Sequence, residues 1–127
     1  MIPPAYVERC VTPQTAAADR GRLLLLVLEG GHAFLMRARA ALECGNLAGF
    51  VTDVSRTQTV IVELAPTLED DGQGDLAAAL ERLHDLLIGN LALGNAERSR
   101  EMIDEMLRGY EPIVDAYRQV VQSASAS

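Results

Sequence analysis

An unbroken apolar run over residues 23–28, at the start of the stretch LLLLVLEGG (23–31), constrains the fold of this chain more than any other feature. Successive residues of an α-helix point about 100° apart, so a run of six apolar side chains covers every side of one helix. The run is too short to span a bilayer, which takes about 20 apolar residues. This helix therefore has to be covered from more than one side, by the chain itself or by a partner.

The periodicity of the apolar residues places two helices in the first half of the chain. Asp19 is the expected N-cap of a first long helix that ends near Glu43, with Gly45 suited to the C′ position after it. Asn46 is expected to cap the second helix. Pro66 should end that helix, because proline lacks the backbone donor and clashes with the preceding turn.

Two further helices are expected in the second half. Asp75 is the expected N-cap of the third, which Gly94 breaks, and Asn95 is the expected N-cap of the fourth. Pro112, with Gly109 close to it, should kink the fourth helix or split it in two. No segment alternates with the period of two that a half-buried strand needs. The sequence therefore predicts an all-α fold, an antiparallel four-helix bundle with short connections.

We expect a single domain, because 127 residues suit one core. It divides into an N-terminal arm over 1–18, the bundle over 19–122 and a disordered tail over 123–127. Prolines oppose regular structure in the arm, although a short extra helix could begin at Pro13. We expect the tail to be disordered because the last residues of the chain, QSASAS, are small and polar.

Composition excludes several classes of function. The formal net charge is −7, and an acidic surface repels phosphate backbones, so we expect no nucleic acid partner and no membrane insertion. Every basic residue is an arginine, which removes lysine Schiff-base and P-loop chemistry. The N-terminus lacks the pattern of a signal peptide, and Cys10 and Cys44 show no pairing pattern. Both observations favour a reduced, cytoplasmic protein.

Sorted by face, the first helix carries two apolar stripes and one mostly solvated face. The expected core stripe holds Leu24, Val27, Leu28, Gly31, Phe34, Leu35, Ala38 and Leu42. The second stripe holds Leu23, Leu26, Gly30, Ala33 and Ala40. The solvated face holds Leu25, Glu29, His32, Met36, Arg39 and Glu43. One core uses one stripe. The second stripe belongs either to a helix that is simply central in the bundle or to a contact with the arm, a second subunit or a foreign helix.

The two adjacent glycines of this helix point to close packing. Each glycine costs about 1 kcal/mol relative to alanine in a helix interior. Something near Gly30 and Gly31 should therefore need the missing side chains, and close approach of another backbone is the usual reason.

Two Glu-x-x-His pairs, Glu29/His32 and Glu81/His84, contain both histidines of the chain. Di-iron and di-manganese carboxylate bundles use two such pairs and one glutamate from each other helix. The glutamates that could complete that set are Glu63 and either Glu101 or Glu105. However, the first pair lies on the solvated face, whereas inner ligands must share the core stripe. We therefore expect no metal and no cofactor, with a di-metal enzyme as the alternative.

Segments spread in order along the chain resemble the flagellin-export chaperones, the FliS-like family. They are Ala5-Tyr6, LVLEGGHAFL (26–35), RTQTVIVELAPTLE (56–69), LERLHDLLIGNLALGN (80–95) and IVDAYRQV (113–120). The second of these is similar to the family's leucine–tyrosine–aspartate–glycine–alanine signature. Leu28 and His84 stand where the family has tyrosines, and Tyr117 stands where a tryptophan is common.

The resemblance implies a cytoplasmic bundle, not an enzyme, that binds the C-terminal segment of newly made flagellin. It implies that the chain prevents premature polymerisation and helps deliver flagellin to the export gate, whose components are further partners. The client would lie as helices in apolar grooves, and Tyr6 would anchor the arm over part of that surface. The candidate partner-binding residues are Tyr6, Leu23, Leu26, Leu28, Gly30, Ala33, Ile61, Leu64, His84 and Leu87. A monomer or weak homodimer is expected, and a homo-oligomeric structural bundle is a second alternative.

Overall fold

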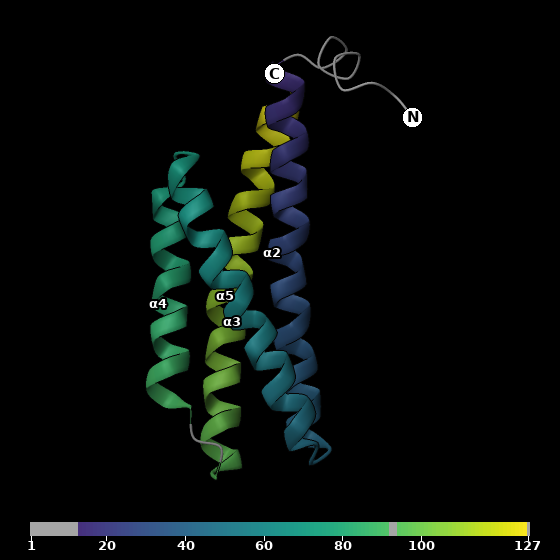
Figure 1. Cartoon of the computed structure of the whole chain (residues 1–127), viewed down its shortest axis with the longest axis vertical. Coiled ribbons are helices and arrows are strands. Elements are labelled where there is room, and N and C mark those ends of the chain that lie inside the picture. Colours follow the sequence, from purple (N-terminus) through teal and green to yellow (C-terminus); the bar gives the residue numbers. More distant parts are fainter. Residues whose placement is uncertain (1–12, 92–93, 127) are drawn as a thin grey trace.

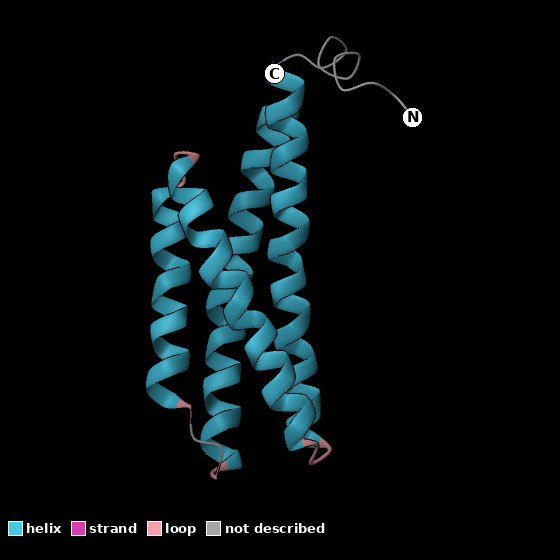
Figure 2. Ribbon diagram, viewed as in Figure 1, coloured by secondary structure: helices cyan, strands magenta, loops and turns pink. Residues whose placement is uncertain are grey.

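The computed structural model describes residues 13–91 and 94–126, and every regular element in these ranges is an α-helix (Figure 1). The helices are α2 (Pro13–Glu43), α3 (Leu47–Asp70), α4 (Gly74–Asn90) and α5 (Ala96–Ala126). Short loops join α2 to α3 and α3 to α4 (Figure 2). The predicted all-α fold is confirmed.

The four helices form an antiparallel bundle in which each helix has two neighbours. α2 packs against α3 and α5, and α4 packs against the same two helices. Within the described ranges α2 and α4 do not contact each other, so they occupy opposite corners of the bundle. α2 and α5 have 31 residues each, against 24 in α3 and 17 in α4, and Figure 1 shows them extending past the α3–α4 loop.

The turn from α2 to α3 is built as the sequence predicts. Gly45 has a φ of +75° and donates its N–H to the carbonyl of Leu42 at 3.2 Å, while the Asn46 N–H reaches the carbonyl of Ala41 at 2.8 Å. This pair of bonds is the Schellman arrangement, which favours glycine at the left-handed position. The Asn46 side chain then accepts the N–H of Gly49 at 2.9 Å, which confirms it as the N-cap of α3.

One of the three remaining N-cap predictions is confirmed, and two are wrong. Asn95 accepts the N–H of Arg98 at 3.0 Å, directly before α5 begins. The prediction for Asp75 is wrong, because α4 begins at Gly74 and Gln73 occupies the cap position without a side-chain bond. Asp75 lies in the first turn instead, where its negative charge still favours the helix dipole.

Both internal prolines are accommodated inside continuous helices. Pro66 does not end α3 as predicted, because the helix continues past it. Pro66 offers no N–H to the carbonyl of Val62, but both residues are exposed and water can bond that carbonyl. Leu68 is fully buried beyond the proline and holds the last turn against the core. Pro112 is likewise exposed inside α5, which is not split.

The start of α2 and the end of α5, which lie side by side, both extend further than the sequence predicts. α2 begins at Pro13 rather than after Asp19, and α5 continues to Ala126 through most of the predicted disordered tail. Proline is well suited to the first helical position. A Cβ at Gly21 would lie 3.4 Å from the Val121 side chain, so the two ends run against each other and support their mutual extension.

The core lies along the axis of the bundle. Its largest fully buried apolar side chains are Leu28, Leu35, Phe50, Ile61, Leu68, Leu80, Ile103, Met106 and Tyr110. Two face assignments on α2 are wrong. Val27, expected in the core, is 41% exposed, whereas Leu25, expected in solvent, is half-buried against the core. In the described ranges, none of the helices has the length and apolarity that a membrane span requires.

Tyr110 joins α5 to α2 at the centre of the bundle. Its hydroxyl donates to the Leu28 carbonyl at 2.6 Å, and its ring edge lies over Gly31. A Cβ at Gly31 would overlap the tyrosine hydroxyl and would lie 3.0 Å from Val60 of α3. Close packing is therefore confirmed at Gly31. At Gly30 a Cβ would meet no described side chain or neighbouring helix within 4 Å, so the packing of the described helices does not require that glycine.

The adjacent glycines give a matched test of this packing. Gly31→Ala should lower the free energy of unfolding by about 2 kcal/mol or more, because the new methyl group displaces the Tyr110 hydroxyl. Gly30→Ala should raise it by up to about 1 kcal/mol, because alanine is the better helix former. Urea unfolding followed by circular dichroism measures both. Equal effects of the two changes would contradict the assigned packing.

Stability should fall at alkaline pH through the same tyrosine. Burial raises the pKa of the Tyr110 hydroxyl above its ordinary value of about 10, so the unfolded chain ionises first. The contribution is fully present below about pH 10 and is lost as the pH rises further. Tyr110→Phe should cost about 1 kcal/mol at neutral pH but flatten the decline in Tm above about pH 10. An unchanged slope would count against this assignment.

Candidate functional site

The outward face of α2 carries a stripe that the described helices leave uncovered. Leu23 is 61% exposed and Leu26 is 65% exposed, although leucine is among the residues most often buried. The same face continues through smaller side chains and one arginine. We name this set the α2 seam, and its residues are Leu23, Leu26, Gly30, Ala33, Arg37 and Ala40.

Seam residues are spaced alternately three and four positions apart, which is the a/d pattern of a coiled coil. A helix laid along α2 would therefore contact all of them at once. α3 and α5 pack against other sides of α2. Within the described ranges, the seam is thus a helix-packing face that has no helix on it.

Gly30 lies in the middle of the seam. It occupies a helix interior, where glycine destabilises by about 1 kcal/mol relative to alanine, and no described part of the chain fills the space beside it. A missing side chain at an exposed helix face allows another backbone to approach closely. This arrangement is suited to a helix that binds from outside.

On its α3 side, the seam borders a shallow, mainly apolar hollow of ≈ 580 Å³. The hollow is lined by Phe34, Val51, Thr52, Ser55, Arg56, Thr59 and Val60. The Thr52 and Thr59 hydroxyls donate to the carbonyls one turn earlier, at 2.9 and 3.1 Å, and so are already satisfied. Arg56 holds its guanidinium 5.7 Å from the centre of the Phe34 ring. The surface therefore offers an apolar floor with a cationic edge.

The groove on the α5 side of α2 has the opposite character. It is a hollow of ≈ 280 Å³ whose lining includes Glu29, His32, Glu111 and Asp115. Asp115 is paired with Arg118 at 2.8 Å. An apolar helix would leave these charged groups without water or partners, so the seam and its α3 side are the favourable surface for it.

A further pair of apolar surfaces lies elsewhere on the bundle. A hollow of ≈ 440 Å³ between the start of α2 and the end of α5 includes Tyr117 and Val121, and an Arg20–Asp71 ion pair of 3.0 Å lies beside it. Burial raises the pKa of the Tyr117 hydroxyl; Asp71 raises it further and Arg20 opposes this. On α4, Ile88 is 58% exposed.

The structure brings together four of the partner-binding residues predicted from the sequence. Leu23, Leu26, Gly30 and Ala33 all lie on the α2 seam. Their shared placement makes them one continuous surface on a single helix. Tyr6 lies outside the described residues.

The other predicted residues lie elsewhere. Leu28, Ile61, Leu64 and Leu87 have exposures of 0, 1, 3 and 2%, so they belong to the core that holds the helices together. His84 is half-buried, with its Nε2 atom 3.3 Å from the Gln58 amide nitrogen, on the α3–α4 side of the bundle. A role of these residues in binding stays a prediction, separate from the seam.

Sequence reasoning missed Arg37, Val27 and Phe34 as residues of this surface. The second stripe predicted from the sequence contains apolar residues alone, yet Arg37 lies seven positions after Gly30 and continues the three–four spacing. Val27 and Phe34 are expected in the core, whereas Val27 is exposed and Phe34 lines the hollow between α2 and α3. The spacing alone could have revealed the arginine.

The histidine pairs do not converge on a metal site. Within the described ranges, no three His, Cys, Asp or Glu side chains are placed so that they could hold a metal ion. His32 lies on the α5 side of α2, whereas His84 is on α4, which does not contact α2. The arrangement that the di-metal alternative needs is therefore not formed by these residues.

Comparison with known proteins identifies a family and several relatives. Residues 4–124 match a family model described as flagellar protein FliS. The chain is 23% identical over 116 residues to the flagellar secretion chaperone FliS of Vibrio cholerae, covering 91% of this chain and 85% of the relative. It is 26% identical over 122 residues to that of Salmonella typhimurium, covering 95 and 90%. With the Campylobacter jejuni protein it shares 29% identity over 99 residues, covering 78 and 77%.

The exposure of the seam has a direct test in stability. Leu26→Asp should change the free energy of unfolding by about 1 kcal/mol or less, because the side chain is already in water. Leu28 lies two positions after Leu26 but is fully buried. Leu28→Asp should therefore lower the free energy of unfolding by more than about 4 kcal/mol, because it buries an unpaired charge. Urea denaturation of both variants measures this, and a large loss from Leu26→Asp would mean that the seam is covered.

Proposed function

The chain belongs to the FliS family, and on that premise we propose that it binds the C-terminal helical segment of flagellin on the α2 seam. The relatives compared above are flagellar secretion chaperones, and the family is one of chaperones rather than enzymes. We place this activity in the cytoplasm, where the bound segment is kept from polymerising early. Delivery to the export apparatus follows from the same complex.

The observation that carries this proposal is the uncovered coiled-coil spacing of α2. A bundle needs one apolar stripe per helix for its own core, and α2 already has that stripe at Leu28 and Leu35. The seam is a second stripe on the opposite side, with Leu23 and Leu26 in water. An amphipathic helix that lies in an apolar groove is a common mode of peptide recognition and would cover it.

The apolar area exposed on the α2 seam limits how much binding free energy the seam alone can contribute. Covering Leu23 and Leu26 would contribute about 2–4 kcal/mol together, since each is already partly shielded. Micromolar affinity requires about 8 kcal/mol net of ordering costs. The seam alone is therefore too small, and the client must also reach the hollow beside Phe34 and Val60.

Prevention of early polymerisation follows from competition for one face. The client we propose is an amphipathic helix that packs through one apolar stripe. While this stripe lies on the seam, it is not available to a second client molecule. Binding to the chaperone and assembly with other clients thus exclude each other without any chemical step.

Titration of the full chain with purified flagellin C-terminal region tests the proposal. Wild type should form a stoichiometric complex by size exclusion and calorimetry. Leu23→Asp and Leu26→Asp should each weaken binding about tenfold or more, because each places a charge in the interface.

Ile88→Asp is the matched control, since Ile88 is 58% exposed on α4, which does not contact α2. It should bind as wild type does. The proposal fails if wild type forms no complex, or if Ile88→Asp weakens binding as strongly as the seam variants do.

A further inference from the structure

We infer that Arg37 fixes the register of the bound client helix by pairing with an acidic side chain of that helix. This inference rests on the proposed binding at the α2 seam and adds the chemistry of the client that the seam selects. The occupant is thus an amphipathic helix with a carboxylate at a set position along its apolar stripe.

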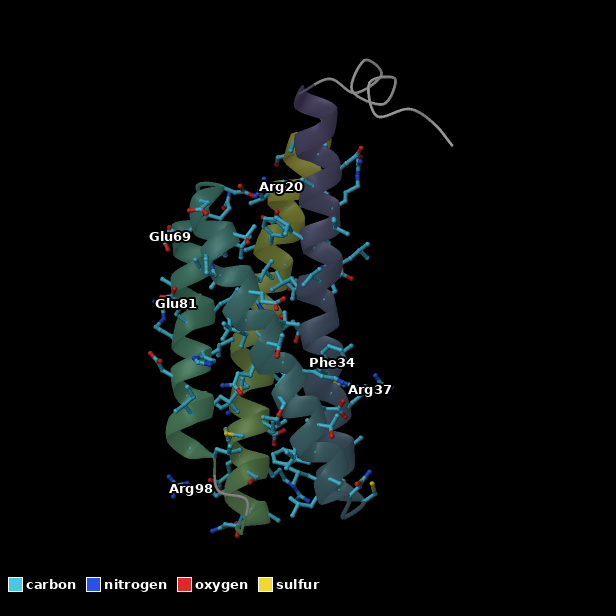
Figure 3. The ribbon with its side chains drawn as sticks, in the orientation of Figure 1. Arg20, Phe34, Arg37, Glu69, Glu81 and Arg98 are labelled. Carbon is cyan, nitrogen blue, oxygen red and sulfur yellow. The ribbon has the colours of Figure 1, made fainter. Side chains whose placement is uncertain are left out.

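Arg37 occupies a seam position, seven residues after Gly30 and fourteen after Leu23. Figure 3 shows it close to Phe34 on α2 and pointing away from the bundle. Among the described residues it forms no hydrogen bond or ion pair. The positions one turn before and after it hold alanines and Phe34, so α2 itself offers no carboxylate within reach.

A charged residue at an a-type position acts on register more than on affinity. A single polar residue at such a position specifies register in a coiled coil, because other alignments leave it unpaired against apolar groups. Guanidinium groups match carboxylates with two parallel hydrogen bonds. A client helix that covers Arg37 therefore has to present an acidic side chain there or lose affinity.

The surroundings of Arg37 make this corner of the surface positive within a chain of net charge −7. Arg56 lies over the neighbouring Phe34 ring, and its own acidic partner Asp53 is 3.7 Å away, longer than a hydrogen bond. Both guanidiniums thus border the same end of the apolar surface. A basic or apolar client residue would be disfavoured at this end.

A second copy of the α2 seam does not supply the missing carboxylate. The α2 seam contains no acidic residue, so no alignment of two seams places an acid of the seam opposite Arg37. In a parallel, in-register pair the arginines would face each other. The charge pattern therefore favours a different helix as the occupant over a homodimer through this face.

The helix geometry sets where the acidic residue lies in the client. Seven residues along α2 correspond to about 10 Å, and a helix packed lengthwise has the same rise per residue. The acid should therefore lie about seven positions from the client residue that packs over Gly30. Small residues at Gly30, Ala33 and Ala40 allow close contact on both sides of this pair.

Charge reversal tests this inference by calorimetry, with the full chain and a peptide covering the C-terminal helical region of flagellin from the same genome. Arg37→Glu should weaken binding about tenfold, and the loss should shrink at high salt. Arg82→Glu is the control, because it makes the same change in net charge on α4, and it should bind as wild type does.

Each acidic residue of the peptide is then replaced in turn by arginine. One replacement, at a single position, should weaken binding to wild type and restore binding to Arg37→Glu. Unchanged binding by Arg37→Glu, an equal loss from Arg82→Glu, or rescue at no position overturns the inference. If Leu26→Asp abolishes binding while Arg37→Glu does not affect it, the proposed function stands and this inference fails. If wild type does not bind, both fail.

Discussion

The packing of Tyr110 on Gly31 fixes how α2 is rotated in the bundle, and the other faces of that helix follow from it. Because the tyrosine hydroxyl is bonded to the Leu28 carbonyl, α5 holds this side of α2 inward. Neighbouring residues of a helix point about 100° apart. Gly30 must therefore face outward when Gly31 faces the core, and Leu23 and Leu26 turn outward with it.

Local signals predicted some helix ends and not others: three turn and cap residues are confirmed, whereas Asp19 and Asp75 do not cap the helices they were expected to begin. The confirmed residues are Gly45, which ends α2, and Asn46 and Asn95, which begin α3 and α5. Each acts through its own backbone or side-chain hydrogen bonds, so its residue type in the sequence is enough to predict its role. Pro66 was misjudged because its effect depends on whether the orphaned carbonyl meets water, which only the packing decides. The extended end of α5 likewise depends on α2 running beside it.

The site was predictable only in part, because a helix with two apolar stripes does not reveal which one faces the core. The stripe of Leu23 and Leu26 was recognised as surplus, and the structure exposes it. Leu28 was placed in the binding set by family resemblance, yet it lies under Tyr110. Arg37 was missed because a search for apolar residues cannot detect a charge that belongs to an apolar pattern.

The unequal helix lengths give the molecule an uneven resistance to opening. The Arg20–Asp71 ion pair marks where α3 ends beside α2, so residues 13–19 continue beyond it with α5 as their one neighbour among the described helices. Local unfolding should begin at that end, where a single described helix lies beside α2 instead of two. The α2 seam begins only after it, along the length that both neighbours brace. A helix arriving there meets a surface that is already ordered, so little conformational entropy is lost on the chaperone's side.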